Sequence, residues 1–228
     1  MHAVEKPERV ADFEALLPDS YVAHPRQISQ GFSFQVGGGV EGSPLPIPAE
    51  TMWPFRDEER GWALSLSSSS IGLESIERYQ HFPTFLSELE AVLTALVQTF
   101  SPKFRTRIGL RYVNQIEDSA LLHGGGLRRF LNPELISPIG GAFGDDLVAG
   151  LSEMRFAEKD GTFVVRHGLV TPTAYLLDFD YFHEEEVGFD LAETKSRVSR
   201  FHDLIERVFV WSLSEPYVAR LQGDSVDG

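Results

Sequence analysis

The sequence contains no cysteine. This absence excludes disulfide scaffolds, thiolate zinc sites, iron–sulfur clusters and cysteine nucleophiles. Long apolar runs are also missing, and none approaches the roughly 18 residues that a membrane-spanning helix requires. The opening residues 1–9 carry acidic side chains and lack the apolar stretch of a secretory signal. We therefore expect a cytoplasmic protein that contacts no membrane.

Basic residues are scarce. Lys and Arg number 20 against 34 Asp and Glu, so the formal net charge is −14, and the acids are spread from Glu5 to Asp227. Sequence-independent affinity for nucleic acid comes from neutralising phosphates with Lys and Arg. A negative field of this size therefore disfavours nucleic acid as a partner.

The remaining composition is that of an ordinary globular protein. The chain has 228 residues, of which 42% are hydrophobic and 24% are charged. This is enough to bury a sizeable core, and the length allows one large domain or two small ones.

Two amphipathic helices are the clearest predicted elements. Apolar residues recur at helical spacing from Phe82 to Phe100, and again over residues 192–213. Pro83 suits the first turn of the earlier helix, and Pro102 ends it. Shorter helical segments are predicted before Pro25 and around residues 127–131.

Strands are predicted where polar and apolar residues alternate. The predicted ranges are 31–36, 62–76 (one strand, or two broken by a bend), 104–116, 147–157, 162–170 and 174–182. Residues 159–161 signal a hairpin turn. Residues 37–59, rich in Gly and Pro, are interpreted as a long loop anchored by Met52, Trp53 and Phe55, and the glutamate-rich residues before 192 as a linker.

These elements predict an α+β fold, with antiparallel sheet or sheets and two long amphipathic helices. A group of strands followed by one long helix occurs twice along the chain. The interpretation is a single α+β domain over residues 1–228. A true duplication would divide it into two pseudo-repeated halves, at about 30–116 and 147–221, joined by a Gly-rich connection.

Two catalytic motifs occur in incomplete form. His123–Gly126 matches the glycine loop that forms an oxyanion hole in lipases, but no Gly-x-Ser-x-Gly nucleophile segment accompanies it. Gly37, Gly39 and Gly42 reproduce a dinucleotide-binding fingerprint, but prolines follow where a helix has to begin. We reject both matches and expect no cofactor.

Asp178 and Asp180 are spaced so that both carboxylates project from one face of a predicted strand. Such a pair could share a Mg²⁺ or Mn²⁺ ion, with residues 183–186 completing the site. Acids on strands are also commonly neutralised by basic residues of the neighbouring strand. Both interpretations stay open, and the second is favoured.

Arg105, Arg107 and Arg111 are predicted to share one face of the strand over residues 104–116. Guanidinium groups bind phosphate or carboxylate groups at two points, so these arginines could bind an anionic ligand. The favoured alternative is an internal salt-bridge network with the two aspartates.

His202 and Glu206 lie one turn apart on the second long helix, a spacing that suits a general base with its orienting partner, or two metal ligands. A surface pair is the favoured interpretation. Trp211 and Tyr217 are interpreted as core or edge aromatics.

Two segments carry a resemblance to a known family. The segment Arg107-Ile-Gly-Leu-Arg-Tyr-Val-Asn-Gln-Ile116 and the later Leu177-Asp-Phe-Asp180 resemble a sporadically distributed family of uncharacterised bacterial proteins with Gly-Leu-Arg-Tyr-x-Asn-x-Ile and Leu-Asp-x-Asp motifs. The resemblance covers residues 32–221 and implies a bacterial cytosolic protein. Its patchy occurrence resembles that of mobile or defence-associated genes.

Three functional hypotheses follow. The first is a non-enzymatic binding or accessory protein that recognises a protein or a small anionic ligand. The second is a metal-dependent hydrolase or phosphodiesterase that uses Asp178 and Asp180. The third is a structural homo-oligomer formed by pairing of strand edges. The candidate ligand-binding residues are Arg107, Arg111, Tyr112, Asn114, Asp178 and Asp180.

Overall fold

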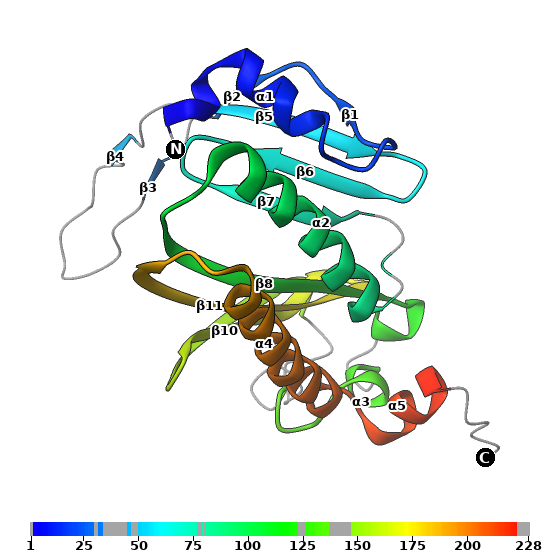
Figure 1. Ribbon diagram of the computed structural model, residues 1–228. Coiled ribbons are helices and arrows are strands. Elements are labelled where there is room, and N and C mark those ends of the chain that lie inside the picture. The colour runs from blue at the N-terminus through cyan, green and yellow to red at the C-terminus, as the bar shows by residue number, and fades with distance from the viewer. Residues whose placement is uncertain are drawn as a thin grey trace. The chain divides into compact units, whose positions relative to one another are not determined.

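The chain forms two compact units, Met1–Lys103 and Phe104–Gly228, seen in the ribbon of a computed structural model (Figure 1). The residues that the structure describes are 2–29, 32–33, 45–46, 50–76, 79, 81–122, 126–136 and 147–222. The fold is α+β, as predicted, with antiparallel sheets and two long helices. Among the described residues, no helix is long and apolar enough to cross a membrane.

The first unit is built on an antiparallel sheet in the order β1, β5, β6, β7, with β2 also paired to β5. Its strands are β1 (Val22–Ala23), β2 (Gln27–Ser29), β5 (Glu50–Asp57), β6 (Trp62–Leu66) and β7 (Ile71–Ser75), with β3 (Phe32–Ser33) and β4 (Leu45–Pro46) forming a separate pair. Its helices are the 3-10 helix η1 (His2–Glu5), α1 (Pro7–Glu14) and α2 (Phe82–Phe100).

Strand β5 corrects the prediction of a long loop over residues 37–59. That prediction rests on the Gly and Pro content of the segment, and proline cannot donate a backbone hydrogen bond. In the structure Pro54 lies where the edge partner of β5 changes, since Met52 pairs with β2 and Phe55 pairs with β1. The Pro54 carbonyl accepts from His24 N at 2.8 Å. The missing N–H therefore falls at a position where proline is tolerated in a sheet.

The core of the first unit lies between one face of this sheet and its two α-helices. Phe13 of α1 contacts Phe55 edge-on, with ring centres 5.8 Å apart, and Phe100 of α2 at 5.9 Å. Trp62 contacts Phe85 of α2 at 6.0 Å. Helix α2 has the predicted bounds. These aromatic contacts anchor both helices on the strands.

The second unit contains a four-stranded antiparallel sheet in the order β8, β11, β10, β9. Its elements are β8 (Phe104–Glu117), η2 (Ser119–Leu122), α3 (Leu127–Phe130), β9 (Gly150–Glu158), β10 (Gly161–Thr171), β11 (Ala174–Gly188), α4 (Leu191–Ser212) and α5 (Glu215–Gln222). The predicted hairpin turn joins β9 to β10. Strand β8, grouped with the first half in the sequence, belongs to the second unit.

Strand β11 is longer than predicted and includes residues 183–188, which were interpreted as a linker. The glutamates continue the pairing with β8 because no proline or glycine interrupts them before Gly188, although the register shifts between Glu184 and Val187. The side chains of Glu184, Glu185 and Glu186 are exposed, so their charges do not oppose strand formation.

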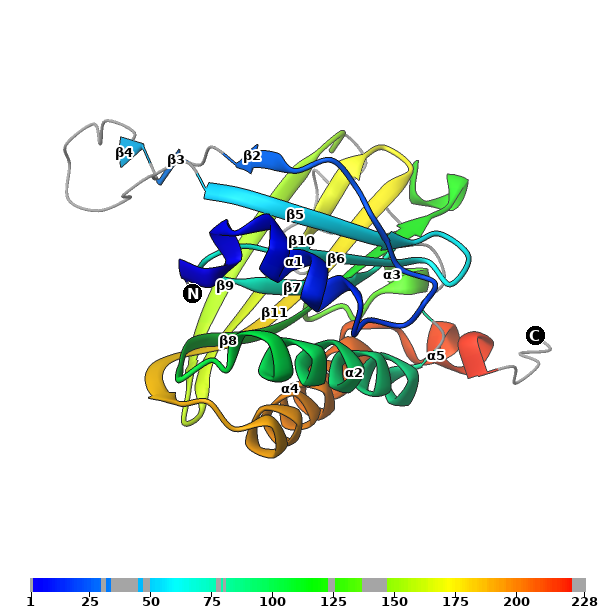
Figure 2. The ribbon, with the colours of Figure 1, turned by 45° about the horizontal axis from the view of Figure 1, so that its top comes forward.

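Helix α4 packs on one face of this sheet, beside β8 and β11 (Figures 1 and 2). Tyr181 and Phe201 have ring centres 4.3 Å apart, and Phe179 meets Phe209 edge-on at 6.3 Å. The Asp190 side chain caps the helix by accepting from Glu193 N at 2.6 Å. Only two residues separate the end of β11 from the start of α4, so the chain reverses there and the apolar face of α4 packs against β11.

Candidate functional site

Asp178 lies on the sheet face turned away from α4, which we call the outer face of the second unit. Its Oδ1 accepts from Arg111 Nε at 2.8 Å, and its Oδ2 accepts from Arg111 Nη2 at 2.8 Å and from Arg166 Nη1 at 3.2 Å. Only 1% of Asp178 is exposed. Two guanidinium groups therefore neutralise a buried carboxylate, as burial of a charge requires.

The ion pairs continue across the sheet to β9. Glu153 accepts from Arg166 Nε at 2.7 Å and from Arg155 Nε at 2.8 Å. Hydrogen bonds from Arg155 and Arg166 hold the pKa of the Glu153 carboxyl below its usual range. For Arg166, burial acts to lower the pKa, but hydrogen bonds to Glu153 and Asp178 outweigh it and raise the pKa. We call Arg111, Asp178, Arg166, Glu153 and Arg155 the charge ladder.

The charge ladder bears on the metal hypothesis. Both oxygens of Asp178 accept hydrogen bonds from arginine, so they are not turned towards a shared ion with Asp180. The neighbouring residues also have other partners: His183 Nε2 lies 3.6 Å from Glu185 Oε2, and Glu184 Oε1 lies 3.4 Å from Arg107 Nε. No group of three potential metal-binding side chains occurs within the described ranges. The geometry favours the internal salt-bridge interpretation of Asp178.

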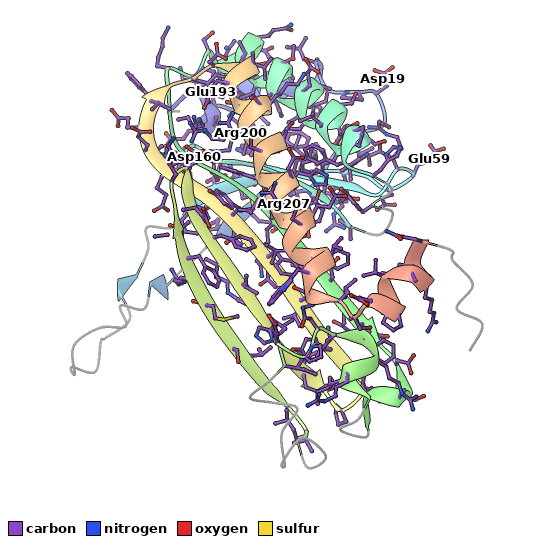
Figure 3. All side chains as sticks on the ribbon, turned by 90° about the horizontal axis from the view of Figure 1, so that it is seen from below. Asp19, Glu59, Asp160, Glu193, Arg200 and Arg207 are labelled. Atoms are coloured by element: carbon purple, nitrogen blue, oxygen red, sulfur yellow. The ribbon has the colours of Figure 1, made fainter. Side chains whose placement is uncertain are left out.

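The other two predicted arginines lie apart from the charge ladder. Arg107 is exposed on the outer face, beside Glu184. Arg105 is buried, and its Nη2 donates to Glu193 at 2.8 Å. Glu193 lies at the start of α4 (Figure 3). The predicted row of three arginines on one face is therefore wrong for Arg105. The alternation of β8 breaks at this end, where its register with β11 shifts.

Tyr112 and Asn114 project from the opposite face of β8, towards α4. The Tyr112 hydroxyl lies 3.1 Å from His202 Nδ1, and His202 Nε2 lies 4.0 Å from Glu206. Asn114 Nδ2 donates to the Leu177 carbonyl at 3.4 Å. His202 and Glu206 were interpreted as a surface pair, but His202 also contacts the Tyr112 hydroxyl on the helix side of the sheet. The contact between Tyr112 and His202 connects β8 to α4.

The six predicted ligand-binding residues therefore do not form one site. Arg107, Arg111, Asp178 and Asp180 belong to the outer face, whereas Tyr112 and Asn114 belong to the helix side. Alternation along β8 already places Arg107 and Arg111 on the face opposite to Tyr112 and Asn114. The sequence could not tell which of these two sets shares a face with Asp178, because that depends on the register of β11 against β8.

The structure gives the two motif segments a common place. Residues 107–116 lie on β8 and residues 177–180 on β11, and the two strands pair with Asp178 opposite Val113. Gly109 lies opposite Phe182, and a β-carbon there would come 3.2 Å from the Phe182 β-carbon. Gly109 allows the two strands to lie close together at Phe182. The ion pair between Arg111 and Asp178 favours this register over its alternatives.

A second histidine–tyrosine contact was not predicted. His167 Nδ1 lies 2.7 Å from the Tyr175 hydroxyl, and both side chains are buried on the helix side of the sheet. Burial lowers the pKa of His167 and raises the pKa of Tyr175. The alternation of His167 with Val165 and Leu169 is the sequence signal that could have placed it in the core.

An apolar hollow of about 380 Å³ opens where α4 ends and α5 begins. It is lined by Asn132, Val210, Trp211, Leu213, Glu215, Val218, Ala219 and Gln222. Trp211 was interpreted as a core or edge residue, yet 46% of it is exposed. The adjoining Tyr217 packs edge-on against Phe130, with ring centres 5.2 Å apart. An exposed tryptophan beside a hollow is a feature of recognition surfaces.

The two rejected glycine motifs, at residues 37–42 and 123–126, lie outside the described residues except for Gly126. A scan against protein-family models, a search of curated proteins and a search of solved structures each found no match. The functional interpretation therefore rests on three features of the structure: the charge ladder of three arginines and two carboxylates on one sheet face, the tyrosine–histidine contacts on the other face, and the apolar hollow at the end of α4.

Proposed function

We propose that this chain is a non-enzymatic binding protein of the bacterial cytoplasm, and that it recognises another protein. The observation that carries the proposal is the exposed Trp211 beside the hollow at the end of α4. The occupant we propose is an apolar segment of the partner protein, with its side chains seated in the hollow.

The chemistry of the hollow supports this occupant. Val210, Trp211 and Leu221 are all exposed large hydrophobic residues of α4 and α5. Tryptophan is strongly enriched among the residues that dominate binding energy, because it buries a large area at little cost in side-chain entropy. Asn132 fixes the main chain at the end of α4, because its Nδ2 donates to the Trp211 carbonyl at 2.9 Å. A polar rim around an apolar centre is the usual anatomy of a protein interface.

The alternative partner, a small anionic ligand, is less well supported. Arg111 and Arg166 both form ion pairs with Asp178, Arg166 also pairs with Glu153, and Arg107 is beside Glu184. An incoming phosphate or carboxylate would have to displace these acids in a chain that already carries a net charge of −14. The outer-face arginines therefore favour a structural role.

Photo-crosslinking tests the proposal. A photoreactive phenylalanine analogue is placed at Trp211 in cells of the source organism, and at the exposed Val113 of β8 as the matched control. We expect a discrete adduct with one other protein from position 211 alone. The purified partner should bind the wild-type chain. Trp211→Ala should raise the dissociation constant of this complex by at least about tenfold, as expected for an interface anchor.

Two outcomes contradict the proposal. One is the same set of adducts from positions 211 and 113, which indicates random collision. The other is a purified partner whose affinity is unchanged by Trp211→Ala while the protein remains folded by circular dichroism.

A further inference from the structure

Strand β9 leaves one edge of the second sheet unpaired within the part of the chain that the structure describes, because β9 pairs with β10 alone. Figure 3 shows the long β9–β10 hairpin, with Asp160 at its turn. Glu158 and Gly161 close this two-residue turn as opposite partners. By the alternation of an antiparallel pair, residues 152, 154 and 156 then bond to β10, and residues 151, 153, 155 and 157 turn their N–H and C=O groups to the free edge.

Three large apolar side chains of β9 are exposed at or beside this free edge. Leu151 is 63% exposed, Phe156 44% and Met154 38%. Proteins ordinarily protect such edges with proline, with charged side chains, lysine above all, or with a bulge. Strand β9 contains neither proline nor lysine, and its pairing with β10 has no register shift. Its charged residues, Glu153, Arg155 and Glu158, are of both signs, so they can pair with a strand of complementary charge. A free edge with these properties is suited to pairing with another strand.

The sequence of β9 is complementary to itself. An antiparallel second copy centred on Met154 pairs the full strand from Gly150 to Glu158. This register sets Glu153 opposite Arg155 of the second copy, twice by symmetry. The two residues belong to the set whose N–H groups face the edge, so they also form the main-chain hydrogen bonds. Met154 then meets its own copy on the two-fold axis, which covers part of its exposed surface.

Neighbouring registers lose this complementarity. Moving the centre to residue 153 places Glu153 against Glu153, and moving it to residue 155 places Arg155 against Arg155. Like charges directly opposite each other destabilise a strand pair. Registers centred further along the strand shorten the overlap. Strand length and charge therefore select the same arrangement.

We propose that two copies of this chain pair through β9 in an antiparallel two-fold arrangement centred on Met154, so that their second units share one continuous sheet. The charge ladder of each copy then meets the other at Glu153 and Arg155, and ion pairs run without interruption across the joined sheet. This two-fold contact is isologous, so the assembly closes as a dimer and does not extend into a fibre. The surface is separate from the Trp211 hollow, so either proposal can fail alone.

Sedimentation equilibrium in about 0.15 M salt, where repulsion between the acidic copies is screened beyond roughly 8 Å, gives the first test. The wild-type chain should sediment at twice its mass of 25.5 kDa. Glu153→Arg and Arg155→Glu should each raise the dimer dissociation constant by at least about tenfold, because each sets like charges opposite one another. An equimolar mixture of the two variants restores opposite charges at both positions, and should dimerise again.

A cysteine experiment tests the register in the otherwise wild-type edge. The chain has no cysteine, so a single Met154→Cys variant has only its own copy to bond with. In the proposed register the two α-carbons at residue 154 form a non-hydrogen-bonded pair about 4.5 Å apart, within the range that a disulfide spans. Phe156→Cys is the control, because the two copies of residue 156 would lie about 14 Å apart at 3.4 Å per residue.

We expect rapid disulfide dimerisation of Met154→Cys under mild oxidation and little for Phe156→Cys. A monomeric wild-type chain up to high concentration overturns the proposal, and so does equal cross-linking of the two cysteine variants. A dimer that persists in both charge variants places the interface elsewhere and also overturns it.

Discussion

Arg111 and Asp178 form a two-point ion pair between neighbouring strands, with Arg111 Nε and Nη2 each 2.8 Å from a carboxylate oxygen. The two residues are 67 positions apart in the chain and belong to the two motif segments, residues 107–116 and 177–180. Their contact favours a structural reason for both segments, because a bidentate pair between strands stabilises one register over its alternatives.

Replacing Asp178 by asparagine should lower the free energy of unfolding by about 1–3 kcal/mol, because Arg111 and Arg166 lose their ionised acceptor. Arg111 is about half exposed and can turn to water, which keeps the loss below that of a fully buried pair. Urea denaturation measures the change. Asp180→Asn, on the same face and directly opposite Arg111 in the strand pairing, is the matched control and should cost no more than about 1 kcal/mol. Equal losses in the two variants would contradict the role of the ladder.

Divalent cations should leave the melting temperature of the wild-type chain unchanged, because arginines already occupy the Asp178 carboxylate. A ligand that binds only the native state at 100 times its Kd would add about 2.7 kcal/mol, a readily measured effect. A thermal-shift titration with Mg²⁺ and Mn²⁺ checks this. A shift that disappears in the Asp178→Asn/Asp180→Asn variant would restore the metal-dependent hydrolase hypothesis.

In the first unit, Arg60 joins two buried carboxylates, with Nη2 2.8 Å from Glu88 and Nε bonded to Asp57. Arg60→Met should destabilise the protein by about 2–4 kcal/mol at pH 7, a figure reduced for the partial exposure of Arg60. Burial acts to raise the pKa of Asp57, but hydrogen bonds from Ser20 and Arg60 prevail and lower it.

A carboxylate with a lowered pKa contributes stability above its unfolded pKa, and this contribution is lost as the pH falls. The cost of Arg60→Met should therefore be greatest near pH 7 and shrink towards pH 4. Chemical denaturation at both values measures it, beside Arg56→Met, which removes an exposed arginine of β5, next to Asp57. A cost independent of pH would argue against the carboxylate role.

His167 should make the second unit sensitive to mild acid. Burial holds the pKa of this imidazole below its usual value. In mild acid, His167 is therefore protonated in the unfolded chain but stays neutral in the folded chain. Stability is complete above about pH 6.5 and declines below it, by up to about 1.4 kcal/mol per pH unit for one proton. His167→Gln should flatten the decline between pH 7 and pH 5 in denaturation curves. Parallel curves for the two proteins would show that other groups cause the acid sensitivity.

Gly168 should not accept even a methyl group. Its φ is +155°, and a β-carbon there would meet the Gly150 carbonyl oxygen at a distance of 1.9 Å. Gly168→Ala should therefore cost more than about 2 kcal/mol, since the obstacle is the main chain of β9. Gly188→Ala is the control, because no atom lies within 4 Å of its added carbon. Thermal denaturation of both variants compares them, and similar melting temperatures would refute the steric account.

Much of the secondary structure could be predicted because its causes are local. Helices α2 and α4 repeat apolar residues at helical spacing over many turns, and the β9–β10 turn has its own sequence signal. Strand β5 and the end of β11 could not be predicted. Pro54 is acceptable only because β5 changes its neighbour there, and residues 184–187 extend the strand only because β8 continues beside them.

The candidate site shows the same division. The sequence by itself determined the fold class, the two long helices and the presence of acids and arginines on facing strands, since composition and periodicity depend on each residue and its near neighbours. Tertiary structure alone decided that Asp178 meets Arg111 and Arg166, that Arg105 turns to Glu193, and that Trp211 borders a hollow. Strand order and register join residues far apart in the chain, and a shift of one residue would exchange the two faces of the sheet.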